Sequence, residues 1–276
     1  MNTRPLLFAA SLLLLNLSAT AQEKSFSGIR SITYGGVGLI SPSPDMKTLS
    51  MIDNGVDFRF GHFQSLFRKN LSKGALQLGL ELRLNYSKFD YNLQPASSIS
   101  NIRYNNGTPT PAAVVLKLES KTKKPDAFHY LIGPSAVFSQ EKFFLGASLL
   151  VGYASVAQEA FRYYDSIQNT ANPAQNRNID FYSGTHETNN GFVFSPGVKA
   201  GFRITRHLAF FVAADYSFGS KQDFVDRIFV PAGNPTNGVY DFQQLRNGTT
   251  ADRERYSQLR ALMLSGNLAL TIPHRK

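Results

Sequence analysis

The chain has 276 residues, no cysteine, 42% hydrophobic residues and a formal net charge of +10 at pH 7. The lack of cysteine excludes disulfides, thiolate catalysis, cysteine-ligated zinc and lipoprotein acylation. The basic residues form no single block and no basic–aromatic nucleic-acid motif occurs, so the charge indicates no nucleic-acid partner.

The N-terminal segment has the three consecutive regions of a secretory signal peptide. Residues 1–21 combine one positive charge at Arg4, an apolar core from Leu6 to Leu17, and the small-residue site Ala19-Thr20-Ala21. The alternative, an uncleaved membrane anchor, needs a longer apolar core of about 20 residues. We therefore predict that residues 1–21 are removed during export through the general secretory pathway, and that residues 22–276 form one domain.

Beyond this segment, apolar residues recur at every second position in eight stretches. They cover residues 26–40, 55–67, 74–91, 126–138, 143–156, 191–204, 208–220 and 257–272. A period of two is that of a β-strand, whose successive side chains point to opposite faces. The alternation is cleanest from Leu76 to Tyr86. At ~3.3 Å per residue and a tilt of ~40°, that run spans roughly 25 Å, the height of the apolar band of a membrane β-barrel.

The connections between the stretches alternate in length. Short turns occur at 68–73, 139–142 and 205–207, and the longer connections are 41–53, 92–125, 157–189 and 221–254. Outer-membrane barrels place short turns in the periplasm and long loops outside the cell. The sequence therefore predicts an all-β fold: a single antiparallel up-and-down transmembrane β-barrel of eight strands, with ten strands as the alternative.

The composition of the second face predicts which side meets lipid. A soluble, secreted lipocalin-like ligand binder alternates in the same way, with its apolar side inside the barrel. Here the second face is rich in glycine, alanine and serine, which suit the narrow interior of an eight-stranded barrel. We therefore predict that the apolar face lies in outer-membrane lipid and lipopolysaccharide.

Seven charged residues also lie on the predicted inward face. They are Asp57, Arg59, Glu81, Arg83, Lys199, Arg203 and Asp215. Positive and negative charges nearly balance, which indicates a lumen charge cluster that plugs the barrel through internal ion pairs. A gated ion path lined by the same residues is the alternative.

The sequence contains no arrangement that indicates catalysis. His129 lies inward on its stretch, but nothing places a serine such as Ser135 within the ~3 Å that a nucleophile and base require. No metal-ligand spacing, phosphate loop or Gly-x-Ser-x-Gly motif occurs. We expect no enzymatic activity, no cofactor and no metal site; a small transport or enzymatic barrel is the alternative.

The long connections are the predicted place of binding. They are rich in tyrosine, asparagine and arginine, including Tyr104, Tyr163, Tyr164, Tyr182, Tyr240, Arg246, Arg253 and Arg255. Such loops suit adhesion, lipopolysaccharide or protein partners. Solvated loops without a dedicated partner are the alternative.

The hairpin at 195–218 carries a resemblance to known proteins. It contains Gly-x-x-x-Gly-aromatic-Arg at 197–203, a tight turn, and Asp215 before Tyr216. With the signal peptide and the eight strands, it resembles the OmpA-like and PorT-like outer-membrane β-barrel families. The resemblance implies the outer membrane of a Gram-negative bacterium and insertion by the barrel-insertion machinery. It also implies a structural or interaction role in envelope integrity, adhesion or a secretion complex.

Overall fold

The computed structural model describes residues 28–50, 52–91, 101–120, 124–158 and 160–273. The predicted signal peptide lies outside these residues. No helix in the described part of the chain is both long and apolar enough to cross a membrane.

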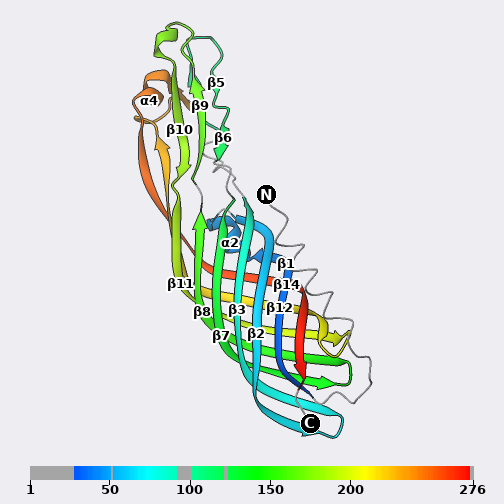
Figure 1. Ribbon diagram of the computed structural model, residues 1–276. Helices are drawn as coiled ribbons and strands as arrows, with labels where there is room; N and C mark the ends of the chain where they lie inside the picture. The colour runs from blue at the N-terminus through cyan, green and yellow to red at the C-terminus, as the bar shows by residue number, and fades with distance from the viewer. Residues whose placement is uncertain (1–27, 51, 92–100, 121–123, 159, 274–276) are drawn as a thin grey trace.

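Eight long strands form the main body of the molecule (Figure 1). They are β1 (Ile29–Pro42), β2 (Ile52–Leu71), β3 (Gly74–Tyr91), β7 (Asp126–Gln140), β8 (Phe143–Gln158), β11 (Glu187–Arg203), β12 (Leu208–Val230) and β14 (Thr249–Pro273). Each pairs antiparallel with its neighbours in the order β11-β8-β7-β3-β2-β1-β14-β12, and β12 pairs back to β11. The pairings therefore close a ring, and the predicted all-β, antiparallel fold is confirmed.

The predicted short turns all lie at one end of the ring, at the lower right in Figure 1. They join β2 to β3, β7 to β8, and β11 to β12. The pairing of Ile29 with Pro273 brings the start of β1 and the end of β14 to the same end. We call it the short-turn end, and the opposite end carries the long connections.

The side chains of the ring strands alternate between solvent and interior as the sequence predicts. On β3, Leu78, Leu80 and Leu82 are 46–48% exposed, whereas Glu81 and Arg83 are buried. The same division holds on the other strands, with exposed apolar residues such as Leu39, Phe60, Ile132, Leu149, Val198, Val212 and Leu264. This is the reverse of a lipocalin-like barrel, which encloses its apolar face.

The interior is filled in three layers. Near the short-turn end lies an apolar cluster of Ile29, Ile32, Tyr34, Phe63, Val137, Phe144, Ala209, Phe211, Ala213 and Ala269. Near the other end lies a second cluster, which includes Leu131, Leu150 and Met263. The short helix α2 (Pro44–Ser50) inserts Met46 into this second cluster. Polar and charged side chains occupy the layer between the clusters.

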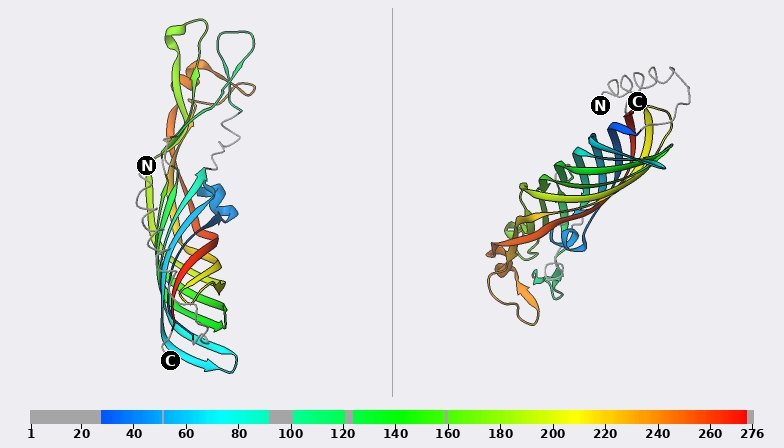
Figure 2. Two further views of the ribbon diagram at one scale, coloured as in Figure 1. Left: turned by 45° about the vertical axis from the view of Figure 1, so that its right-hand side comes forward. Right: turned by 90° about the horizontal axis from the view of Figure 1, so that it is seen from below.

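The long connections fold together into a lobe beyond the ring, which we call the head (residues 101–120, 160–184 and 221–256; Figure 2). Strands β12 and β14 run on into it and pair with each other as far as Val230 and Thr249. Strands β10 (Arg177–Gly184), β9 (Phe161–Ile167) and β6 (Lys117–Ser120) extend the same sheet.

A second small sheet and two short helices complete the head. Strand β13 (Val239–Asp241) pairs parallel with β4 (Arg103–Asn105), which pairs with β5 (Ala112–Ala113). Helix α4 (Phe242–Arg246) and the 3₁₀ helix η2 (Pro173–Gln175) lie beside them.

The head has its own hydrophobic core. It consists of Ile102, Tyr104, Val114, Phe161, Tyr163, Ile167, Ile179, Phe181, Tyr182, Phe229, Phe242 and Leu245. Residues of three separate connections contribute, so these segments are not independent solvated loops.

Candidate functional site

The structure brings six of the seven predicted inward charges together in the middle layer of the ring. They are Asp57, Arg59, Glu81, Arg83, Lys199 and Asp215, all with side chains at most 4% exposed. We call this set the charge cluster. Three cations face three carboxylates, so the cluster is formally neutral.

Asp215 lies at the centre of the ion-pair network, because it bridges the two arginines. Its Oδ2 accepts a hydrogen bond from Arg59 Nη1 at 2.5 Å, and its Oδ1 accepts one from Arg83 Nη1 at 2.6 Å. Arg59 also lies 3.4 Å from Asp57, whose other oxygen accepts the Ser87 hydroxyl at 2.8 Å. Strands β2, β3 and β12 are thereby connected through the interior.

Glu81 organises the other half of the cluster. Its Oε1 accepts hydrogen bonds from Arg83 Nη2 at 2.9 Å and from the Tyr34 hydroxyl at 2.5 Å, and its Oε2 accepts one from Lys199 Nζ at 2.7 Å. The Lys199 ammonium also lies 5.7 Å from the Tyr34 ring centroid and 5.6 Å from that of Phe63. Since a buried charge is tolerated only with partners, this dense pairing is what allows the cluster to form.

A glycine makes room for the central carboxylate. Gly197 pairs with Asp215 across β11 and β12, and a Cβ at Gly197 would collide with the Asp215 carboxylate. The small residues of the inward face therefore leave space for the charge cluster.

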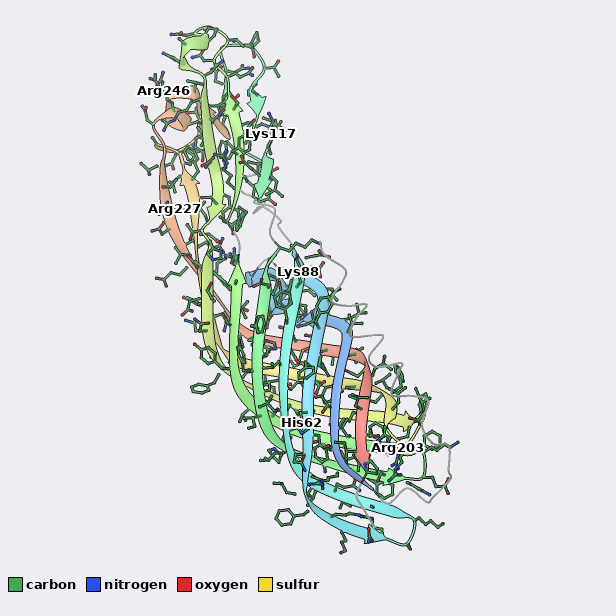
Figure 3. The ribbon with its side chains drawn as sticks, in the orientation of Figure 1. His62, Lys88, Lys117, Arg203, Arg227 and Arg246 are labelled. Carbon is green, nitrogen blue, oxygen red and sulfur yellow. The ribbon has the colours of Figure 1, made fainter. Side chains whose placement is uncertain are left out.

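Arg203, the seventh predicted member, does not join the charge cluster. It lies at the short-turn end of β11, where its Nη2 donates to the Glu141 carbonyl oxygen at 2.5 Å (Figure 3). Its backbone N–H donates to the Lys142 carbonyl oxygen. Arg203 therefore ties the β11–β12 turn to the β7–β8 turn.

The histidine considered for catalysis is fully buried and has no nucleophile bonded to it. Neither ring nitrogen of His129 has a hydrogen-bond partner among the described residues. Ser135 instead donates its hydroxyl to the Ala147 carbonyl oxygen at 3.2 Å. No group of three or more potential metal-ligating His, Asp or Glu residues occurs within the described ranges.

A second buried ion pair lies within the head, where β10, β12 and β14 meet. Arg255 on β14 binds Asp226 on β12 through two nitrogens, and the Tyr182 hydroxyl donates to the same carboxylate at 2.5 Å. Burial, and then the hydrogen bond to Asp226, raise the pKa of the Tyr182 phenol well above its usual value. The neutral phenol is therefore strongly favoured in the folded protein.

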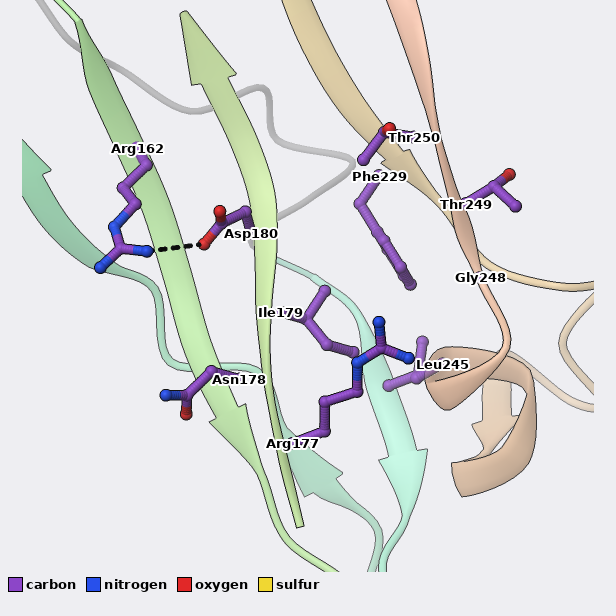
Figure 4. A pocket seen from close by; sticks show the side chains of 10 residues that line it. All are labelled: Arg162, Arg177, Asn178, Ile179, Asp180, Phe229, Leu245, Gly248, Thr249 and Thr250. Carbon is purple, nitrogen blue, oxygen red and sulfur yellow. Dashed lines mark ion pairs between the residues drawn. The ribbon is translucent and has the colours of Figure 1, made fainter. Parts of the chain in front are cut away.

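The head also contains a pocket of about 580 Å³ (Figure 4). Strand β10 pairs with β12 only over Tyr182–Gly184, so the two strands diverge beyond Tyr182. The pocket lies beside this divergence, with Ile179, Phe229 and Leu245 as its buried apolar part.

Polar groups surround that apolar part. Arg177 reaches across to donate to the Arg246 carbonyl oxygen at 2.7 Å, while Thr249 and Thr250 line the opposite wall. Arg162 and Asp180 form a 3.6 Å ion pair at the edge. The pocket thus places guanidinium and hydroxyl groups next to apolar side chains.

Several residues that build these sites were not among the predicted ones. Tyr34 belongs with the charge cluster, and its place on the inward face follows from the alternation of β1. Asp226 lies in the connection at 221–254, and its partner Arg255 was expected only as one of the arginines of the binding loops. Their only sequence signal is opposite charge, which many solvated residues share.

The chain was compared with families and with known proteins. No family model matches, and no curated protein matches. Among solved structures, the chain is similar to the attachment invasion locus protein Ail of Yersinia pestis (10% identity, TM-score 0.37, 91% of this chain and all of that one).

Two further solved structures show comparable values. A major outer membrane protein from Thermus thermophilus has 10% identity and a TM-score of 0.40 over 87% of this chain and 99% of that one. The outer membrane protein OprG from Pseudomonas aeruginosa has 11% identity and a TM-score of 0.37 over 89% and 97%. The class of this protein therefore rests on its own residues.

Proposed function

We propose that the protein is an outer-membrane β-barrel of eight strands that holds a folded head outside the cell, with a structural or interaction role. The observation that carries this proposal is the outward apolar face, which is present on all eight ring strands. In water, so large an apolar surface promotes association. In a bilayer it is the surface that lipid requires, and a closed ring leaves no unpaired strand edge in the hydrocarbon.

The orientation follows from the connections. Short turns face the periplasm in such barrels, which puts the head and its pocket on the extracellular side. Lipid and lipopolysaccharide then surround the ring, and the barrel-insertion machinery places it in the outer membrane of a Gram-negative bacterium. The OmpA-like and PorT-like families are the ones to which we assign it.

The filled interior supports an anchor rather than a channel. Two apolar clusters lie on either side of the charge cluster, and the ion pairs within that cluster satisfy one another. Because an eight-stranded barrel is narrow enough for side chains to fill, no continuous water path is needed or expected. The head supplies the binding surface, and we propose no enzymatic activity.

Reconstitution tests this proposal. The chain without residues 1–21 should fold into lipid vesicles, leaving the head cleavable by added protease and the ring protected. Planar bilayers that contain the folded protein should show no reproducible conductance. A protein that stays soluble and monomeric without lipid or detergent would contradict the membrane assignment, and a reproducible open channel would contradict the plugged interior.

A further inference from the structure

The charge at the short-turn end is almost entirely positive. Besides the buried Arg203, six basic residues lie there, which we call the basic rim: Arg30, Arg68, Lys69, Lys73, Lys142 and Arg206. Arg68 is half-buried and the other five are exposed. Glu141 is the acidic residue described at this end. The overall basic balance of the chain is therefore concentrated at one end of the ring.

The acidic side chains that the structure describes do not neutralise the basic rim. None of its six residues forms an ion pair with a described residue. At the opposite end of the ring, by contrast, three of the described cations are paired: Lys47 with Asp53 at 2.8 Å, Lys221 with Asp223 at 3.1 Å, and Lys124 with Asp90. Lys88 forms no ion pair with a described residue. Among the described residues, the rim is thus a band of positive charge without an internal counter-charge, and an external anion can supply one.

Exposed apolar side chains alternate with the rim cations. Phe67 is 72% exposed and Phe143 69% exposed, and each is followed or preceded directly by a basic residue. Ile204 lies two residues before Arg206 and is 51% exposed. The rim is thus continuous with the outward apolar face of the ring.

The rim also extends around the ring rather than along one side. Its residues come from the start of β1, from the end of β2 and from the turns that join β2 to β3, β7 to β8, and β11 to β12. A single protein partner would contact one side of such an arrangement. A shell of lipids contacts all of it.

From these features we infer that the basic rim binds the anionic phospholipid headgroups of the periplasmic leaflet. The inference rests on the proposed membrane function. Lysine and arginine side chains extend from an apolar surface to the headgroup level, where they attract negative charge. The aromatic and aliphatic neighbours lie in the acyl region while the cations meet phosphate, which fixes the depth of the ring in the bilayer.

The test is the lipid selectivity of the folded protein, measured with spin-labelled lipids by electron paramagnetic resonance. We expect labelled phosphatidylglycerol to associate more strongly than labelled phosphatidylcholine, on the order of fivefold for a headgroup that meets one rim cation at low ionic strength. Added salt should reduce the preference, because it screens exposed charges.

Two variants with equal loss of positive charge locate the effect. The rim variant replaces four of the five exposed rim residues, Lys69, Lys73, Lys142 and Arg206, by glutamine. The control variant replaces the exposed head residues Arg103, Lys117, Arg246 and Arg253 by glutamine. The rim variant should lose most of the preference for phosphatidylglycerol, whereas the control should keep it.

The outcomes separate the two proposals. If the protein inserts into vesicles but binds both lipids equally, the lipid site is refuted and the membrane function stands. Equal loss in both variants would also refute it, since total charge would then be the cause. If the parent chain inserts into neither neutral nor anionic vesicles, the membrane function fails and the lipid site fails with it.

Discussion

The substitution Asp215→Asn tests the energetics of the charge cluster directly. Asp215 holds two arginines at 2.5 and 2.6 Å, with side chains at most 2% exposed. Asparagine keeps the shape but removes the charge, so the cluster changes from three cations and three carboxylates to three cations and two carboxylates. Leaving one buried charge uncompensated costs about 3–5 kcal/mol.

The free energy of unfolding in detergent or vesicles, followed by tyrosine fluorescence in urea, measures this cost. The matched control is Asp252→Asn, which breaks the exposed pair with Arg227 and should cost less than about 1 kcal/mol. The double variant Arg59→Gln with Asp215→Asn restores neutrality and should be less destabilised than the sum of its two single variants. If Asp215→Asn costs no more than the control, the charge cluster does not hold the ring together as argued.

Three further predictions concern the outward face and the head. Leu80→Lys should reduce the stability of the inserted ring by about 2–4 kcal/mol, whereas the control Leu80→Ala should reduce it less. If the lysine variant inserts as well as the parent, this face does not meet lipid. The pKa of Tyr182 is raised in the folded head, so the neutral phenol contributes fully to the stability of the head below the ordinary pKa of 10.0, and this contribution declines as the pH rises above that value. Hydrogen exchange in the head should therefore accelerate above pH 10 in the parent, and less so in Tyr182→Phe. Phe181→Ala removes a fully buried aromatic side chain from the head core and should destabilise the head by about 3–5 kcal/mol. The head should then be cleaved faster by protease while the strand ring stays protected. Unchanged proteolysis would mean that this core contributes little to the stability of the head.

The ring strands could be predicted because each has two faces in different surroundings. The leucines from Leu76 to Leu84 point outward and the residues between them inward, so the period of two is visible without any tertiary information. The same rule puts Asp57, Glu81 and Asp215 on the inward face, and all three are buried in the structure.

Arg203 shows that alternation does not predict the position of a residue along the barrel axis. It shares the inward face with Lys199, but four residues at ~3.3 Å put it about 13 Å farther along the strand. Alternation gives the face of a residue and not which charges lie at the same height. Height depends on the register between strands, such as the pairing of Asp215 with Gly197, and the sequence does not state it.

The head could not be predicted for a related reason. Its core joins residues from three connections, and its contacts are distant in sequence: the Tyr104 hydroxyl accepts the Gln168 N–H, and the Val115 N–H donates to Asp165. Strand β9 does alternate, with Phe161, Tyr163 and Ile167 buried. The stretch is short and polar, however, and such a signal also occurs in exposed loops.

Strands β12 and β14 pass without interruption from the ring into the head, with a bulge near Gly219 where the two regions meet. A pull on the head along these strands would load many of their hydrogen bonds in parallel, as shear, instead of opening them one after another. A bulge concentrates bending at a defined point. If the head is bound to another surface, it would therefore tilt at its base under a sideways force and resist a force along its axis.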